Sequence, residues 1–289
     1  GFNDITIKGV CKENLNFGTA TKDEPASSGN PAPKYLRLVG FDGNAVITDA
    51  SNYEQSVIRV DAGTLVVENL IVEGGNYTIS GNRNANVLLS GVTVQHFTER
   101  GVSISDSSYL GVDESGLTVT TNKVAASDVN QEGIRYVAGS SGWLHTVEVS
   151  NVDRGIAVYG GSMTYAYSFN IHDVGRAIAV DNSRFLKYGE GNSVVKSTSS
   201  RAITVYSGSF MHWEGNLEIN NISDRAFDAD RSTIEMLNVK MGGNQSTQDD
   251  VASIRNSKFR IVNLEISNSG DDGLRIDGSE GSIENLTIN

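Results

Sequence analysis

The amino-acid sequence predicts an all-β protein whose parallel strands stack coil upon coil into a β-solenoid, that is, a single-stranded parallel β-helix. A short phrase, seen as "VDRGIAVYGGS" and again as "VGRAIAVDNS", recurs along most of the chain every 22–25 residues or so. Within each copy, apolar and polar residues alternate, which places them on opposite faces of a strand. Such a strand cannot bury its apolar face alone, but stacked copies build a continuous core.

The repeat can be followed from "ERGVSIS" at Glu99 to "DDGLRID" near the end of the chain. The apolar residues that match between copies are Val102, Ile134, Ile156, Ile178, Ile203, Phe227, Ala252 and Leu274. By subtraction their spacings are 32, 22, 22, 25, 24, 25 and 22 residues. The one long interval contains "DESGLTVTTNKVAASDVNQ", which predicts an insertion loop over residues 113–130.

The repeat predicts a single elongated domain over residues 1–289. Residues 1–50 are expected to form N-terminal coils and a cap, and residues 131–289 to form regular coils. The chain stops at "SIENLTIN", in the middle of the pattern, so we expect its C-terminal end to be incomplete. Gly, Ser, Asn and Asp gather at the joints between strands, as turns require. The Leu-x-x-Leu-x-Leu signature of a leucine-rich horseshoe is absent from the sequence.

Composition narrows the classes of partner. Asp and Glu outnumber Lys and Arg by 35 to 23, which gives a formal net charge of −12 and disfavours nucleic acid. No apolar stretch approaches the roughly 20 residues of a membrane span. A single cysteine, Cys11, excludes a disulfide framework within this chain.

The repeat also resembles a known superfamily. The "GIAV" strands and the "NSGDDGLRI" phrase resemble the right-handed parallel β-helix repeats of pectin-lyase-like proteins. The opening "ITIKGVCKENLNF", followed by "YLRLVGFDGNAVIT", resembles the first coils of secreted bacterial members. The resemblance implies a right-handed solenoid and a secreted or cell-surface location, in a bacterium. Because the superfamily includes pectate lyases, polygalacturonases, alginate epimerases, tailspikes and adhesins, the scaffold does not by itself select a function.

The outward positions of the repeat strands supply the candidate catalytic residues. If Ile156 and Val158 face inward, the alternating set faces outward and becomes charged toward the C-terminus. A glycoside hydrolase needs two carboxylates beside the glycosidic bond, and a lyase needs a base and a cation that stabilises the enolate. The catalytic candidates are Asp181, Tyr206, Asp228, Asp230 and Arg255. Surface ion pairs between neighbouring coils are the alternative account of the same residues.

A second set is predicted to bind substrate. Arginines at one repeat position should stack about 4.8 Å apart, with carboxylates or an anionic ligand between them. These arginines are Arg100, Arg154, Arg176, Arg201 and Arg225. Aromatic residues after the strands are candidates for stacking on sugar rings, among them Trp143. The predicted substrate-binding residues are Tyr159, Tyr188, Arg201, Trp213, Arg225, Arg275 and Asp277.

Metal and cofactor signals are sparse. Asp228 and Asp230 are candidates for holding Ca²⁺ at the surface, although "DADRSTIE" is no EF-hand, since Thr233 stands where that loop requires glycine. No other cofactor is predicted. The sequence has no HExxH pair, nucleophile elbow or phosphate-binding loop, so whether the protein is an enzyme stays open.

Two functions therefore follow from the sequence. The first is a secreted β-helix that binds or processes an acidic polysaccharide along its outer strand face. If it is an enzyme, it is expected to be a polysaccharide lyase or a glycoside hydrolase. The second is a non-catalytic solenoid of the adhesin or tailspike kind, in which the rod is a spacer. The sequence predicts no oligomeric state.

Overall fold

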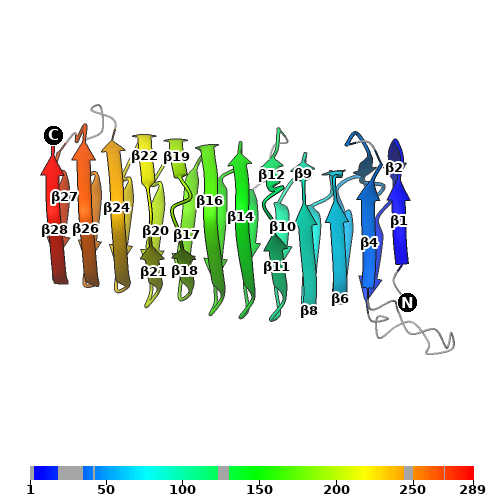
Figure 1. Cartoon of the computed structure of the whole chain (residues 1–289), viewed down its shortest axis with the longest axis horizontal. Helices are drawn as coiled ribbons and strands as arrows, with labels where there is room; N and C mark the ends of the chain where they lie inside the picture. Colours follow the sequence, from blue (N-terminus) through cyan, green and yellow to red (C-terminus); the bar gives the residue numbers. More distant parts are fainter. Residues whose placement is uncertain (1–2, 19–34, 42, 123–129, 244–249, 270) are drawn as a thin grey trace.

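The protein is a rod of parallel strands stacked side by side from its N-terminal to its C-terminal end (Figure 1). A computed structural model describes residues 3–18, 35–41, 43–122, 130–243, 250–269 and 271–289. All regular elements in these ranges are strands, so the predicted all-β parallel solenoid is confirmed. Nowhere in these ranges is there a helix with the length and hydropathy needed to cross a membrane.

The strands form three parallel ladders, which we name A, B and C in the order in which each coil visits them. Ladder A contains β1 (Asn3–Ile7), β4 (Tyr35–Gly40), β11 (Tyr109–Val112), β18 (Arg184–Lys187) and β21 (Phe210–Trp213). Ladder B contains β2 (Val10–Lys12), β5 (Val46–Thr48), β7 (Ile71–Glu73), β9 (Val92–Gln95), β12 (Leu117–Thr120), β19 (Ser193–Thr198) and β22 (Leu217–Ile222).

Ladder C carries the repeat on which the fold prediction was based. Its strands are β3 (Leu15–Gly18), β10 (Arg100–Ile104), β13 (Glu132–Tyr136), β15 (Arg154–Tyr159), β17 (Arg176–Asp181), β20 (Ile203–Tyr206), β23 (Phe227–Asp230), β25 (Ala252–Arg255) and β27 (Leu274–Asp277). Two long strands pass from ladder C into ladder A: β6 (Ile58–Glu68) and β8 (Tyr77–Ser90). Five pass from ladder A into ladder B: β14 (Ser141–Ser150), β16 (Met163–Val174), β24 (Thr233–Gly243), β26 (Lys258–Ser267) and β28 (Glu280–Ile288).

The predicted register of ladder C is confirmed. Each repeat residue pairs with its copy in the next coil, from Val102 opposite Ile134 through to Ala252 opposite Leu274. The inward residues Ile156 and Ile178 are fully buried. Between paired residues the coil length is 22–25 residues from Ile134 onward, as the spacings predicted.

Polar residues form the turn between ladders B and C. In four coils one residue there adopts a positive φ, a conformation that asparagine and aspartate tolerate better than most residues. The residues at this turn are Asn151, Asp173, Asn221 and Asn268, with φ of 55°, 53°, 55° and 56°. In these four coils the chain therefore turns from ladder B to ladder C with the same local conformation.

Parts of the predicted domain division lie in the described residues and parts do not. Within the expected insertion, Leu117–Thr120 forms β12 and pairs with both β9 and β14. Residues 123–129 of that insertion, and residues 19–34 of the expected cap, lie outside the described residues. Cys11 is a half-buried free thiol.

The interior contains an aromatic cluster that corrects one site prediction. Trp213 is fully buried, with its ring 5.4 Å from that of Phe169 in an edge-on contact and 6.2 Å from that of Phe185 in a stacked one. The expectation that Trp213 belongs to a substrate-binding surface is wrong, because its side chain points into the core.

Candidate functional site

Most of the predicted site residues lie in two columns on the outer face of ladder C, where a column is a set of residues paired from coil to coil. The first column contains Tyr159, Asp181, Tyr206, Asp230, Arg255 and Asp277. The second contains Ala157, Ala179, Thr204, Asp228, Ser253 and Arg275. The alternation in the sequence therefore grouped these residues correctly.

Asp228 is the centre of a charged cluster in this face. Arg201 Nη1 lies 2.9 Å from Asp228 Oδ2, and Arg255 Nη2 lies 3.1 Å from Oδ1. Arg225 Nη1 is 3.7 Å from Oδ2, and the Tyr206 hydroxyl donates to the same oxygen at 2.5 Å. Burial and the neighbouring Asp228 carboxylate raise the pKa of Tyr206 to about 12.

The sequence predicted an accessible carboxylate at Asp228, and this is wrong. The side chain is 0% exposed, because long arginine and tyrosine side chains from the flanking coils lie over it. Its two oxygens are occupied by the three guanidiniums and the Tyr206 hydroxyl. This arrangement matches ion pairing between coils, the alternative account of these residues.

The remaining predicted residues on ladder C lie outside this cluster. Asp230 is 3.4 Å from Arg231 Nε and accepts a hydrogen bond from Asn256 Nδ2 at 3.1 Å. The exposed side chains of Asp181, Arg275 and Asp277 form no ion pair within the described ranges. No group of three or more metal-binding side chains occurs in that part of the chain either. Catalysis by these residues and Ca²⁺ binding at Asp228 and Asp230 stay predictions.

A second buried cluster, centred on Glu132, was missed in the sequence. Glu132 is 4% exposed, and its oxygens lie 3.2 Å from Arg100 Nε, 3.5 Å from Arg135 Nε and 3.2 Å from Arg154 Nη1. The Tyr159 hydroxyl donates to Glu132 at 3.3 Å. The available signal was "QEGIRYV", in which a glutamate stands at the arginine position of the repeat.

The predicted arginine stack is present, and most of it is neutralised internally. Arg100, Glu132, Arg154 and Arg176 follow one another in paired register. The Glu132 and Asp228 clusters together account for four of the five predicted arginines, Arg176 being the exception.

The outer face of ladder A carries a row of aromatic side chains that crosses successive coils. The ring of Trp143 lies 6.2 Å from that of Tyr165, which in turn lies 6.1 Å from that of Tyr188. The row continues to His212, 5.1 Å from Tyr188. We call these four residues the aromatic row. All are half-buried or exposed, with Tyr188 at 37% exposure.

A groove of about 570 Å³ opens at the Trp143 end of the aromatic row. Its wall combines Trp143 and Leu88 with the exposed carboxylates of Asp113 and Glu114. Gly111 pairs with Trp143 and keeps the groove open, since a Cβ there would stand 2.8 Å from Leu88 Cδ2. The sequence identified Trp143 and Tyr188 as candidates but not the contribution of His212 or Gly111.

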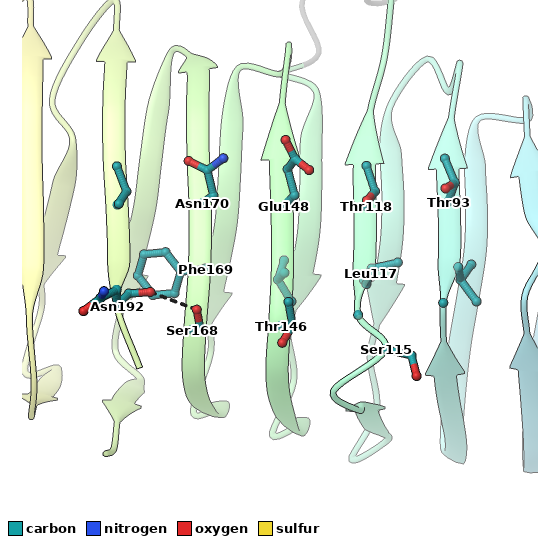
Figure 2. Close-up of a pocket in the computed structure, with 15 residues that line it drawn as sticks. Thr93, Ser115, Leu117, Thr118, Thr146, Glu148, Ser168, Phe169, Asn170 and Asn192 are labelled. Carbon is teal, nitrogen blue, oxygen red and sulfur yellow. Dashed lines mark hydrogen bonds between the residues drawn. The ribbon is translucent and has the colours of Figure 1, made fainter. Parts of the chain in front are cut away.

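A second groove, of about 480 Å³, runs over the outer face of ladder B. Figure 2 shows Thr93, Thr118, Glu148 and Asn170 side by side across neighbouring strands of this groove. The Ser168 hydroxyl donates to the Asn192 carbonyl at 2.8 Å along its edge. This groove is lined mainly by neutral polar side chains and has no aromatic ring on its outer surface except the largely buried Phe169.

His172, in β16, links two carboxylates at this face of the rod. Its Nδ1 lies 2.7 Å from Asp173 Oδ2 and its Nε2 lies 3.2 Å from Glu148 Oε1. Partial burial lowers the pKa of His172, but the hydrogen bonds to Asp173 and Glu148 outweigh that effect and raise the pKa above 6.5. Protonated His172 therefore stabilises the folded state.

We expect His172→Gln to make the free energy of unfolding less dependent on pH. Because the folded pKa is raised, the contribution of His172 is complete below about pH 6.5 and is lost as the pH rises through the folded value. Urea unfolding measures the free energy of unfolding at about pH 5.5 and at about pH 8.5. Between these pH values the wild type should lose up to about 1 kcal/mol more of this free energy than His172→Gln does. An equal loss of unfolding free energy in both proteins would contradict the pairing of His172 with Asp173 and Glu148.

Comparisons with known proteins assign no family to this chain. No family model matches the chain, and no curated protein matches it. Among solved structures, ORF18 of Geobacillus virus E2 is similar, with a TM-score of 0.42 and 12% sequence identity. The match covers 100% of this chain and 54% of that protein, so the chain spans about half its length. Membership of the pectin-lyase-like superfamily is not shown by these comparisons.

Proposed function

We propose that this β-solenoid binds a polysaccharide along the outer face of ladder A. The observation that carries the proposal is the aromatic row, in which Trp143, Tyr165, Tyr188 and His212 follow one another at 5.1–6.2 Å. Tyrosine, tryptophan and histidine offer an apolar ring with a polar edge, which suits the mixed apolar and hydroxyl surface of a sugar. A row across the coils presents such contacts repeatedly, as a polymer requires.

Negative charge beside the aromatic row affects which polysaccharide, charged or uncharged, is expected to bind. Asp113 and Glu114 are exposed where the groove opens beside Trp143. Like charges would repel a polyanion at this end. An uncharged polysaccharide is therefore expected to bind the row more tightly than a uronate polymer. The acidic polysaccharide predicted from the sequence is the second ligand to compare. The secreted or cell-surface location predicted from the sequence is kept as part of this proposal.

Trp143→Ala and Tyr188→Ala are expected to weaken polysaccharide binding by roughly 5- to 30-fold each, the equivalent of about 1–2 kcal/mol. Each removes a ring from the row without touching the core, since both side chains lie on the outer face. Isothermal titration calorimetry against neutral glucans, galactomannan, pectin, alginate and hyaluronan, with and without Ca²⁺, would measure the change.

Phe41→Ala is the matched control, because Phe41 is a 64% exposed aromatic residue away from the row, packed under Lys8. It should bind as wild type does. Equal losses of affinity in Phe41→Ala and Trp143→Ala would show that the aromatic row is not the binding site. No binding to any polymer in the panel would refute the proposal and favour a rod that serves as a spacer.

The same incubations can report catalysis. Absorbance of unsaturated uronates would indicate a lyase, and new reducing ends without that absorbance would indicate a hydrolase. Either signal, if it disappears in Trp143→Ala, would show that a reaction takes place on the polymer bound at the row.

A further inference from the structure

Among the described residues, Arg176 is the one member of the predicted arginine stack that contacts no carboxylate. It pairs in register with Arg154, and the hydrogen bonds Ala177 N to Ala202 O and Ser200 N to Gly175 O place Arg201 in the next coil beside it. In the described part of the chain, Arg154 and Arg201 each contact a carboxylate, whereas Arg176 forms no ion pair and its buried Nε has no hydrogen-bond partner.

Arg176 lies between two other guanidinium-bearing residues, Arg154 and Arg201. Paired strands lie about 4.8 Å apart, so guanidinium-bearing residues flank Arg176 on both sides. Burial lowers the pKa of Arg176, and the charge of Arg154 lowers it further, with a smaller contribution from Arg201. The carboxylates that pair with these neighbours, Glu132 with Arg154 and Asp228 with Arg201, are each shared among several arginines. An oxyanion bound at Arg176 would offset the repulsion between the neighbouring guanidiniums. It would also accept a hydrogen bond from a guanidinium whose Nε has no acceptor among the described residues.

The Asp228 cluster shows how this scaffold holds a carboxylate. Asp228 stands three residues after Arg225, and it also contacts Arg201 of the preceding coil. Ala179 occupies the same column two coils earlier, paired through Thr204. It likewise stands three residues after an arginine, Arg176, with Arg154 in the preceding coil. Ala179 therefore has two arginines in the same relative positions as those beside Asp228, but it has no carboxylate of its own.

We infer that the outer face of ladder C contains a carboxylate-binding site at Arg176, flanked by Arg154 and Arg201, at the position where Ala179 replaces the aspartate of the Asp228 cluster. The occupant is a carboxylate of a ligand, either a small free carboxylate or a uronate unit of a polymer. The fork of a guanidinium fits two carboxylate oxygens. The site lies on another ladder from the aromatic row and does not depend on it.

One carboxylate of the chain itself could compete for this site. Asp181 ends the strand that begins with Arg176, is exposed, and forms no ion pair within the described residues. If Asp181 reached Arg176 in solution, Asp181→Asn would strengthen binding of an added carboxylate. If Asp181 stays in solvent, Asp181→Asn would change binding only slightly. Weaker binding in Asp181→Asn would contradict the site, because removing a neighbouring negative charge should not lower the affinity for a carboxylate.

The experiment follows the Nε–Hε resonance of Arg176 in ¹⁵N-labelled protein during titration with acetate and, separately, with a galacturonate trimer, at constant ionic strength. The expected result is a saturable shift that is absent in Arg176→Gln. Tighter binding of the trimer than of acetate would identify a uronate as the source, and equal binding would identify a small carboxylate. The Nε–Hε resonance of Arg231, which is 70% exposed, is the control for non-specific charge effects.

A matched pair of variants tests the geometry. Ala179→Asp supplies the carboxylate internally, so it should abolish the response of Arg176 to acetate and melt at a higher temperature than Ala179→Asn, its uncharged counterpart. Trp143→Ala should keep the full response, which separates this site from the proposed polysaccharide surface. The inference is overturned if the Arg176 shift is linear and no larger than that of Arg231, or if Ala179→Asp melts no higher than Ala179→Asn.

Discussion

Replacing Asp228 with alanine is expected to lower the free energy of unfolding by about 3–5 kcal/mol. The Asp228 carboxylate is 0% exposed and neutralises Arg201 and Arg255 at 2.9 and 3.1 Å, with Arg225 at 3.7 Å. Removing one partner of a buried ion pair leaves the other charges uncompensated, and here three guanidiniums would lose their shared acceptor. Urea unfolding followed by circular dichroism measures the loss.

Asp230→Ala is the control, because Asp230 lies on the same strand but, within the described residues, its carboxylate contacts only the exposed side chains of Arg231 and Asn256. Its cost should stay within about 1 kcal/mol. Equal costs for the two variants would contradict the buried cluster. Added acetate should raise the melting temperature of Asp228→Ala more than that of wild type, because it can take the vacated position between the arginines.

This expectation changes how a catalytic role for Asp228 has to be tested. A variant that unfolds loses activity whatever its chemistry, so loss of turnover in Asp228→Ala would not identify a catalytic residue. Asp228→Asn keeps the volume and part of the hydrogen bonding and is the informative variant. If Asp228→Asn is folded but inactive, the catalytic prediction for Asp228 is supported. If it is folded and active, that prediction is wrong.

Replacing Trp213 with alanine is expected to lower the free energy of unfolding by about 3–5 kcal/mol and to leave polysaccharide binding unchanged. The Trp213 ring is fully buried between Phe169 and Phe185, so its removal leaves a cavity in a packed aromatic cluster. Thermal and urea unfolding would report the destabilisation, and calorimetry below the melting temperature would report the binding.

Trp143→Ala should behave in the opposite way, which makes the two tryptophans of this chain a matched pair. Trp143 lies on the outer face of ladder A, where truncation removes a contact for a ligand but no core packing. Its free energy of unfolding should change by less than about 1 kcal/mol. Loss of binding in Trp213→Ala protein that is still folded would contradict this division of roles.

The local pattern of the sequence was enough to predict the fold and the register of ladder C. Alternation separates the two faces of a strand, and equal spacing of "RGIAV"-like phrases pairs each residue with its copy, so Ile156 had to meet Ile178. The same logic placed Tyr206, Asp228 and Arg255 on one face, and the structure confirms that they are in contact.

The residues of ladder A could not be placed in the same way, because the sequence pattern does not give the length of the turns between ladders. Turns of unequal length separate ladder C from ladder A: the paired inward residues Thr164 and Phe185 come six residues after Val158 and five after Val180. Alternation in ladder C therefore did not establish that Trp213 faces the core. For the same reason the aromatic row could not be assembled from the sequence, although two of its members were identified.

The sequence by itself thus determined the solenoid, the pairing of its coils and the charged character of the outer face of ladder C. Only the tertiary structure decided which of those charges meet solvent. The physical reason is side-chain reach: arginine and tyrosine extend across one coil spacing, so they cover Asp228 and Glu132 from neighbouring coils. Arg176, between these two clusters, forms no ion pair within the described chain.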